Sequence, residues 1–152
     1  MARAKAQAGW QRLELRGLPR AAVLSADTTV ALEGRILGKP ADRREATGML
    51  VALSGRRHEV LTAVALKHEE RMECVVSVSE VEFKPLSAEE IRRYTATGEC
   101  DDKAGAYAIQ GRAAQFVSEL RGSFSGVMGL PLYETARLLE RMGAQGERRN
   151  PR

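Results

Sequence analysis

The chain has 152 residues and a formal net charge of +4, with 43% of its residues apolar and 29% charged. That length and composition suit one folded domain of ordinary size and argue against a wholly disordered chain. No apolar run approaches the ~20 residues of a membrane-spanning helix, and the first residues lack the apolar core of a secretory signal, so we expect a cytoplasmic protein with no membrane partner.

The positive charge is concentrated at the two ends of the sequence. Residues 1–20 carry a net charge of +4 and residues 141–152 carry +3, which leaves −3 for the residues between them. Aromatic residues make up only 5% of the chain, whereas nucleic-acid surfaces interleave aromatic and basic side chains. We therefore expect no nucleic-acid partner. Cys74 and Cys100 lack a CxxC spacing, which argues against a disulfide framework or a structural zinc site.

The first third of the chain predicts one helix followed by short strands. Residues 2–13 are rich in Ala, Lys, Arg and Gln and predict a helix. The apolar run 21–26 predicts a buried strand and 28–32 a second one, with Asp27 breaking the two apart. Residues 36–37 predict a short extended piece.

The middle of the chain predicts a helix and two longer strands. Asp42 and Glu45 have the spacing of a capping box, and apolar residues at helical spacing follow as far as a stop at Gly55. Strands are predicted over 58–66 and 72–83. The apolar positions of the second strand change phase, which predicts a bulge or a sharp bend.

The last third predicts three helices and one strand. Ser87 and Glu90 form a second capping box that opens a helix. Residues 113–120 predict a third helix, 122–130 contain a predicted strand, and Pro131 opens a final helix. Helices and hairpins do not alternate strictly, so the fold is α/β without being a plain doubly wound sheet.

Three local clusters carry residue types that suit phosphate or nucleotide chemistry. Asp27 lies between apolar segments, where it is either a turn residue or a site residue at a strand end. Lys39 lies between a glycine and a proline, and from that rigid loop its charge could reach a phosphate. Residues 102–111 combine small residues with an acid, a base and an amide. Gln110 could read the edge of a nucleobase, although an ordinary Gly-rich connection would look the same.

Other residues that often mark sites do not form a recognisable motif here. GRILGKP has too few residues between its glycines for a P-loop. His58 and His68 lack a metal-ligand spacing, and His58 is predicted to be a surface residue at a strand end.

The clusters belong to four ordered segments: ADTTVALEGRILGKP, LSGRRHEVLTAVAL, GECDDKAGAYAIQG and GSFSGVMGLPLYETARLL. Together these segments resemble the Maf family of nucleoside triphosphate pyrophosphatases, also called septum formation inhibitor Maf, over about residues 21–140. The resemblance extends to the ARAKA segment near the N-terminus. It implies an α/β fold of the Maf/ITPase-like kind, in which helices flank a bent mixed β-sheet and a cleft separates two lobes. The domain is then expected over 1–143, with a disordered basic tail over 144–152.

The resemblance also implies a reaction and the residues that perform it. Family members hydrolyse a nucleoside triphosphate between the α- and β-phosphates, which releases a monophosphate and pyrophosphate. Asp27 matches the catalytic acid–base residue, which would also hold Mg²⁺ or Mn²⁺. Lys39 matches a lysine that contacts phosphate, and Thr28 and Gln110 match the branch that prefers dTTP and UTP. The substrate-binding residues implied by the resemblance are Lys39, Thr28, Gln110, Asp102 and Lys103.

The sequence departs from the family pattern at its start. Family members begin with a strand and a Ser-x-Ser-Pro-Arg-Arg loop, which has no match here, so the expectation is a domain that is incomplete at its N-terminus. The sequence therefore leaves three hypotheses open: a Mg²⁺-dependent dTTP/UTP pyrophosphatase, a catalytically impaired nucleotide-binding or regulatory protein, or a truncated gene product with no stable function. It also leaves open whether the chain forms a homodimer.

Overall fold

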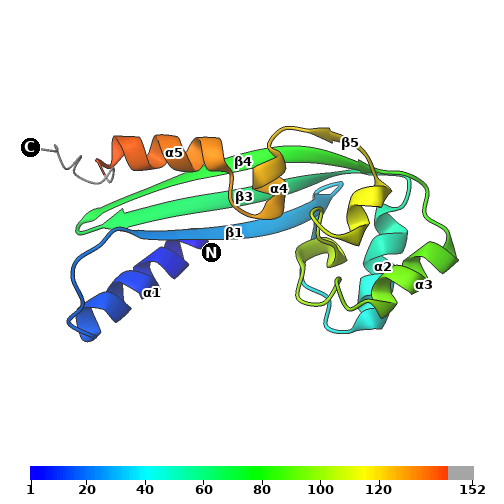
Figure 1. Ribbon diagram of the computed structural model, residues 1–152, viewed down its shortest axis with the longest axis horizontal. Coiled ribbons are helices and arrows are strands. Elements are labelled where there is room, and N and C mark those ends of the chain that lie inside the picture. Colours follow the sequence, from blue (N-terminus) through cyan, green and yellow to red (C-terminus); the bar gives the residue numbers. More distant parts are fainter. Residues whose placement is uncertain (144–152) are drawn as a thin grey trace, which may run out of the picture. The chain divides into compact units, whose positions relative to one another are not determined.

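The computed structural model describes residues 1–143, so the tail predicted over 144–152 lies outside the described residues. Its strands form one sheet in the order β2-β1-β3-β4-β5 (Figure 1). The strands are β1 (Val23–Leu32), β2 (Arg35–Leu37), β3 (Arg57–His68), β4 (Arg71–Phe83) and β5 (Val117–Arg121). The α-helices are α1 (Ala2–Leu15), α2 (Arg43–Leu53), α3 (Ala88–Ala96), α4 (Phe124–Met128) and α5 (Leu132–Arg141). Two short 3₁₀ helices are η1 (Ala104–Ala106) and η2 (Arg112–Phe116).

The α/β class is confirmed, and the sheet is antiparallel rather than mixed. Two-residue turns at 33–34 and 69–70 join β1 to β2 and β3 to β4. Such short turns can join only antiparallel neighbours, because a parallel pair needs a crossover of a dozen residues or more. The cleft between two lobes stays a prediction. No helix within residues 1–143 is long and apolar enough to cross a membrane.

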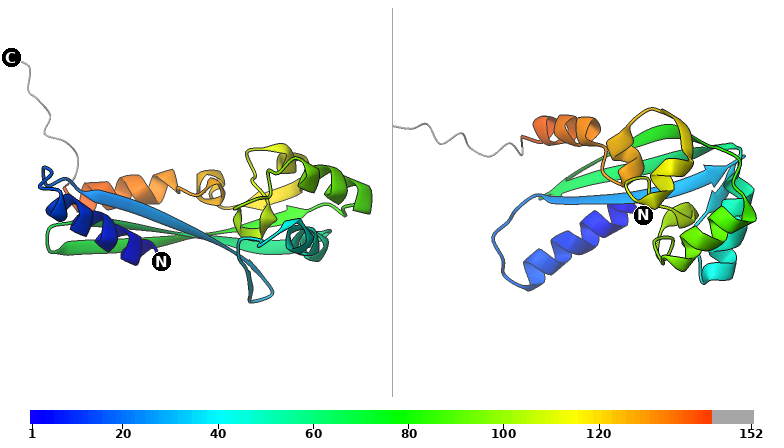
Figure 2. Two further views of the ribbon diagram at one scale, coloured as in Figure 1. Left: turned by 90° about the horizontal axis from the view of Figure 1, so that it is seen from below. Right: turned by 45° about the vertical axis from the view of Figure 1, so that its right-hand side comes forward.

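The described chain forms two compact units, and β1, β3 and β4 contribute to both. Unit 1 contains residues 1–27, 63–76 and 132 onward, and unit 2 contains residues 28–62 and 77–131. In unit 1, α1 and α5 lie on opposite faces of the strands (Figures 1 and 2). The buried Ala2 and Ala6 of α1 pack with Ala65 of β3. Because these side chains are small, the helix axis can approach the sheet closely.

Unit 2 holds the larger apolar core and both predicted capping boxes. At α3 both reciprocal bonds form: the Glu90 amide donates to Ser87 Oγ at 3.1 Å, and the Ser87 amide donates to Glu90 Oε2 at 2.9 Å. At α2 the Glu45 amide donates to Asp42 Oδ1 at 2.8 Å, but the Glu45 carboxylate accepts from the Ala41 amide instead. Both helix starts are therefore confirmed, since each cap satisfies amides that lack a partner within the helix.

The predicted break at Asp27 is wrong, because 23–32 is one continuous strand. An acid inside an apolar strand is costly only while its charge has no partner. Asp27 has a partner in Lys5 of α1, which lets the strand continue through it.

Two further predictions, between residues 113 and 130, are also wrong. The helix predicted over 113–120 is the 3₁₀ helix η2 followed by β5, and the strand predicted over 122–130 contains the helix α4. Ser123 caps α4 by accepting from the Gly126 amide at 2.9 Å, and Gly129 ends it with a φ of 117°. Short apolar runs do not distinguish strand from helix, so these caps were the better signal.

The sequence predicted a bulge or sharp bend where the apolar positions of β4 change phase, but the strand has no bulge there. Ser77, Ser79, Val81 and Phe83 are buried in unbroken alternation, while Val76 and Val78 are exposed. Serine can occupy these buried positions because its hydroxyl finds a partner: Ser79 Oγ accepts from the Ser123 amide at 2.9 Å. The only register shift between β4 and β5 falls between Glu82 and Phe83.

Candidate functional site

The first candidate group is an ion pair between α1 and β1 in unit 1. Lys5 Nζ contacts Asp27 Oδ1 and lies 3.5 Å from the Ala26 carbonyl oxygen. The Ser25 hydroxyl donates to the Ala2 carbonyl at 2.6 Å and ties the start of α1 to the strand. The Asp27 side chain is 21% exposed, so its carboxylate is sheltered but still open to solvent. The pair thus joins a sheltered acid to a cation that is half exposed to solvent.

Lys5 is a candidate site residue that sequence reasoning did not single out. It lies in the ARAKA segment, one residue before the buried Ala6 and three after the buried Ala2. The sequence did carry one signal for such a residue. A carboxylate inside an apolar strand, such as Asp27, requires a partner that offsets its charge.

A second candidate group joins two loops of unit 2. Lys39 Nζ donates to Asp102 Oδ1 at 2.7 Å, and the Gly105 amide donates to the Gly38 carbonyl at 3.1 Å. Hydrogen bonding from Lys39, with its charge, holds the pKa of Asp102 below the ordinary value. Both side chains are exposed, at 63% and 78%. The structure thus brings together two residues that the sequence had placed in separate clusters.

Lys103 and Gln110 come from the same loop as Asp102 and are exposed. Neither side chain makes a hydrogen bond or ion pair with another described residue. An ammonium group and an amide with free donors and acceptors remain available to a ligand.

Thr28 is placed differently from its neighbour Asp27, because successive strand residues point to opposite faces. The Thr62 hydroxyl donates to the Gly126 carbonyl at 2.7 Å, and the Thr28 and Thr62 hydroxyl oxygens are 2.9 Å apart. Since a hydroxyl has one hydrogen, Thr28 must be the donor to Thr62. Thr28 could therefore contact a ligand only as an acceptor.

The prediction that His58 lies at the surface is wrong. Its side chain is 2% exposed, and Nε2 lies 2.8 Å from the Tyr107 hydroxyl oxygen. Burial lowers the pKa of His58 from 6.5 to about 4, and the backbone at Arg56 opposes this more weakly. The imidazole is therefore neutral at pH 7, and it contacts the loop that carries Lys103 and Gln110.

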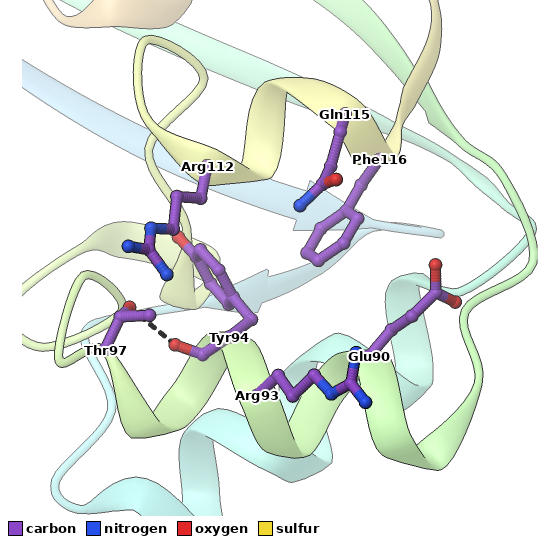
Figure 3. A pocket seen from close by; sticks show the side chains of 7 residues that line it. All are labelled: Glu90, Arg93, Tyr94, Thr97, Arg112, Gln115 and Phe116. Atoms are coloured by element: carbon purple, nitrogen blue, oxygen red, sulfur yellow. Dashed lines mark hydrogen bonds between the residues drawn. The ribbon is translucent and has the colours of Figure 1, made fainter.

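A pocket of about 300 Å³ lies between α3 and η2 in unit 2 (Figure 3). Tyr94 and Phe116 line it, with the guanidinium groups of Arg93 and Arg112 at its edges. Arg93 is already paired with Glu89. None of the six residues that the sequence selected lines this pocket, so it is separate from the candidate site.

Within residues 1–143, no three His, Cys, Asp or Glu side chains form a ready-made metal site. Asp27 would therefore offer a metal ion a single carboxylate. Magnesium commonly binds through one or two carboxylates together with substrate phosphates, so Asp27 fits a metal that is bound jointly with a substrate.

Comparison with known proteins places the chain in a family. A family model described as Maf-like protein matches residues 1–142. The chain belongs to the Maf family. The matched range contains Lys5, Asp27, Lys39, residues 102–103 and Gln110, so both candidate groups fall within the range that the family model matches.

Three curated Maf relatives are named dTTP/UTP pyrophosphatase. The protein from Aromatoleum aromaticum is 59% identical over 143 residues, which cover 94% of this chain and 69% of that protein. The relative from Nitrosomonas europaea is 55% identical over 139 residues, covering 91% of this chain and 67% of that protein. The relative from Bordetella avium is 56% identical over 142 residues, covering 93% and 71%.

Proposed function

We propose that this Maf chain hydrolyses dTTP and UTP to the monophosphate and pyrophosphate. The observation that carries the proposal is its 55–59% identity, over more than nine tenths of its length, to three relatives with that name. The triphosphate substrate also suggests the cytoplasm as the place where the reaction occurs.

Asp27 is the proposed general base. Its carboxylate would accept a proton from the attacking water as the water oxygen bonds to the α-phosphorus. The bond from that phosphorus to the bridging oxygen then breaks, and pyrophosphate leaves with the electron pair. Lys5, in contact with Asp27, would orient the carboxylate and present a positive charge to the phosphates.

Lys39 and Lys103 are the proposed phosphate contacts. Lys39 is paired with Asp102 at 2.7 Å, but both side chains are more than half exposed, and an exposed ion pair contributes little because solvent screens it. A charge-assisted bond to phosphate contributes about 1.5–3 kcal/mol. A triphosphate could therefore draw Lys39 away from Asp102, while the unpartnered Gln110 remains free to contact the pyrimidine edge.

Mg²⁺ or Mn²⁺ is the proposed cofactor, with Asp27 as the protein group that would hold it together with substrate oxygens. When bound, such an ion would offset charge on the triphosphate and on the leaving pyrophosphate.

The test is pyrophosphate release from dTTP and UTP by the chain and by Asp27→Asn, with Glu70→Gln as the control. Glu70 is an exposed carboxylate in the turn between β3 and β4. We expect Asp27→Asn to lose about 10²–10⁴-fold in turnover, the usual contribution of a general base, and Glu70→Gln to match the unsubstituted chain. Full turnover by Asp27→Asn would refute its role. Nucleotide binding without turnover by the unsubstituted chain would favour the nucleotide-binding alternative.

A further inference from the structure

The loop that carries Asp102, Lys103 and Gln110 has an unfavourable backbone. Asp102 and Ala106 have φ values of 58° and 62°, in the left-handed region that residues other than glycine seldom adopt. Gly105, between them, has a φ of 68°, and a Cβ there would lie 3.0 Å from the Val30 side chain. Conformations of this kind persist only where surrounding contacts hold them.

Two buried tyrosines supply those contacts. The Tyr107 hydroxyl is hydrogen-bonded to His58 Nε2 at 2.8 Å, with side chains 6% and 2% exposed. The Tyr94 hydroxyl, from α3, accepts from the Ala108 amide at 3.3 Å and donates to the Glu99 carboxylate at 3.1 Å. These two anchors hold adjacent residues, 107 and 108, just ahead of Gln110.

The rings around His58 leave it little freedom. The His58, Phe83 and Tyr107 rings pack edge to face on one another, with centroids 4.8–5.5 Å apart. Tyr94 packs in the same way against Phe116 at 5.3 Å, and the two rings form the wall of the pocket in Figure 3. The packed rings hold the imidazole in place on β3. Its hydrogen bond to Tyr107 therefore fixes where the loop lies relative to the sheet.

We infer that His58 and Tyr107 are positioning residues for pyrimidine selection: their buried bond fixes the loop that presents Lys103 and Gln110. The inference rests on the proposed function and adds residues that do not themselves touch the nucleotide. An anchor of this kind affects how well the loop fits the correct base more than it affects the chemical step.

The test compares Tyr107→Phe and His58→Leu with the unsubstituted chain. Each substitution removes the bond between the two side chains. The preference for UTP over CTP, as a ratio of kcat/KM values, should fall about tenfold, with more change in KM than in kcat. His58→Gln, which keeps a hydrogen-bonding group, should recover part of the preference. Amide hydrogen exchange over 102–111 should quicken in the first two variants.

Val64→Ala is the control for destabilisation, since Val64 is fully buried on the part of β3 that belongs to unit 1. It should lower the melting temperature and leave both the base preference and loop exchange unchanged. An unchanged preference in Tyr107→Phe, or an equal loss in Val64→Ala, would overturn the inference. Hydrogen exchange reports on the loop without turnover, so an inactive unsubstituted chain would contradict the proposed function alone.

Discussion

Replacing Lys39 by methionine separates phosphate binding from loop structure. Lys39 is 63% exposed and its ion pair with Asp102 is also exposed, so removing it should cost little stability. A lost charge-assisted bond to phosphate is worth about 1.5–3 kcal/mol, which converts to roughly 10- to 150-fold in kcat/KM. We therefore expect Lys39→Met to unfold at nearly the same temperature and to hydrolyse dTTP roughly 10- to 150-fold less efficiently.

Asp102→Asn is the matched control, because it removes the same ion pair and keeps the ammonium group. Pyrophosphate release over a range of dTTP concentrations gives kcat and KM for both variants, and thermal unfolding gives their stability. Asp102→Asn should lose less activity than Lys39→Met, because it breaks the same exposed pair but keeps the ammonium group that would contact phosphate. An equal loss in both variants would show that the ion pair, rather than a phosphate contact, is what activity requires.

Metal dependence, base selection and acid stability give three further tests. We expect EDTA to abolish turnover and Mg²⁺ to restore it; full turnover in EDTA would contradict this. Gln110→Ala should reduce the preference for UTP over CTP about tenfold, as expected for one lost hydrogen bond, and an unchanged preference would make Gln110 structural. Because the folded pKa of His58 is lowered from 6.5 to about 4, the unfolded chain binds the proton first. The free energy of unfolding should fall by about 3 kcal/mol between pH 7 and 4 from this residue. Urea titrations at pH 7 and pH 4 should show that the unfolding free energy of the chain falls by that much more than that of His58→Gln.

Elements fixed by local hydrogen bonds were predicted well from the sequence. The helix starts at Asp42 and Ser87 depend on partners three residues away, and both are confirmed. Elements fixed by tertiary packing were predicted poorly. Phe116 has helical spacing with its neighbours, but it is buried against Tyr94 and Phe83, and the chain turns into β5 after it. Spacing alone does not show which partner a short apolar segment will find.

The candidate site residues show the same difference between local signals and tertiary contacts. Resemblance to the family placed Asp27, Lys39 and Asp102 in it, but the pairs that they form join residues 22 and 63 positions apart. No periodicity reveals a contact of that separation. The exposed side chains gave no signal either, since an unpartnered Gln110 and an ordinary surface glutamine look alike in sequence. Lys5 was missed because a single lysine in an Ala-rich helix is also typical of a solvated surface.

The places where local rules failed are informative about function. Asp27 lies inside a strand where an apolar residue would be easier to bury, and Asp102 has a backbone that favours glycine. Neither acid stabilises the fold by itself. Asp27 requires Lys5 beside it, and Asp102 requires a loop that is anchored at Tyr107 and Ala108. A sequence selected for stability alone would replace both acids, because apolar and glycine substitutions at these positions relieve the cost. Retaining the acids together with their supporting contacts is what is expected of residues kept for their chemistry.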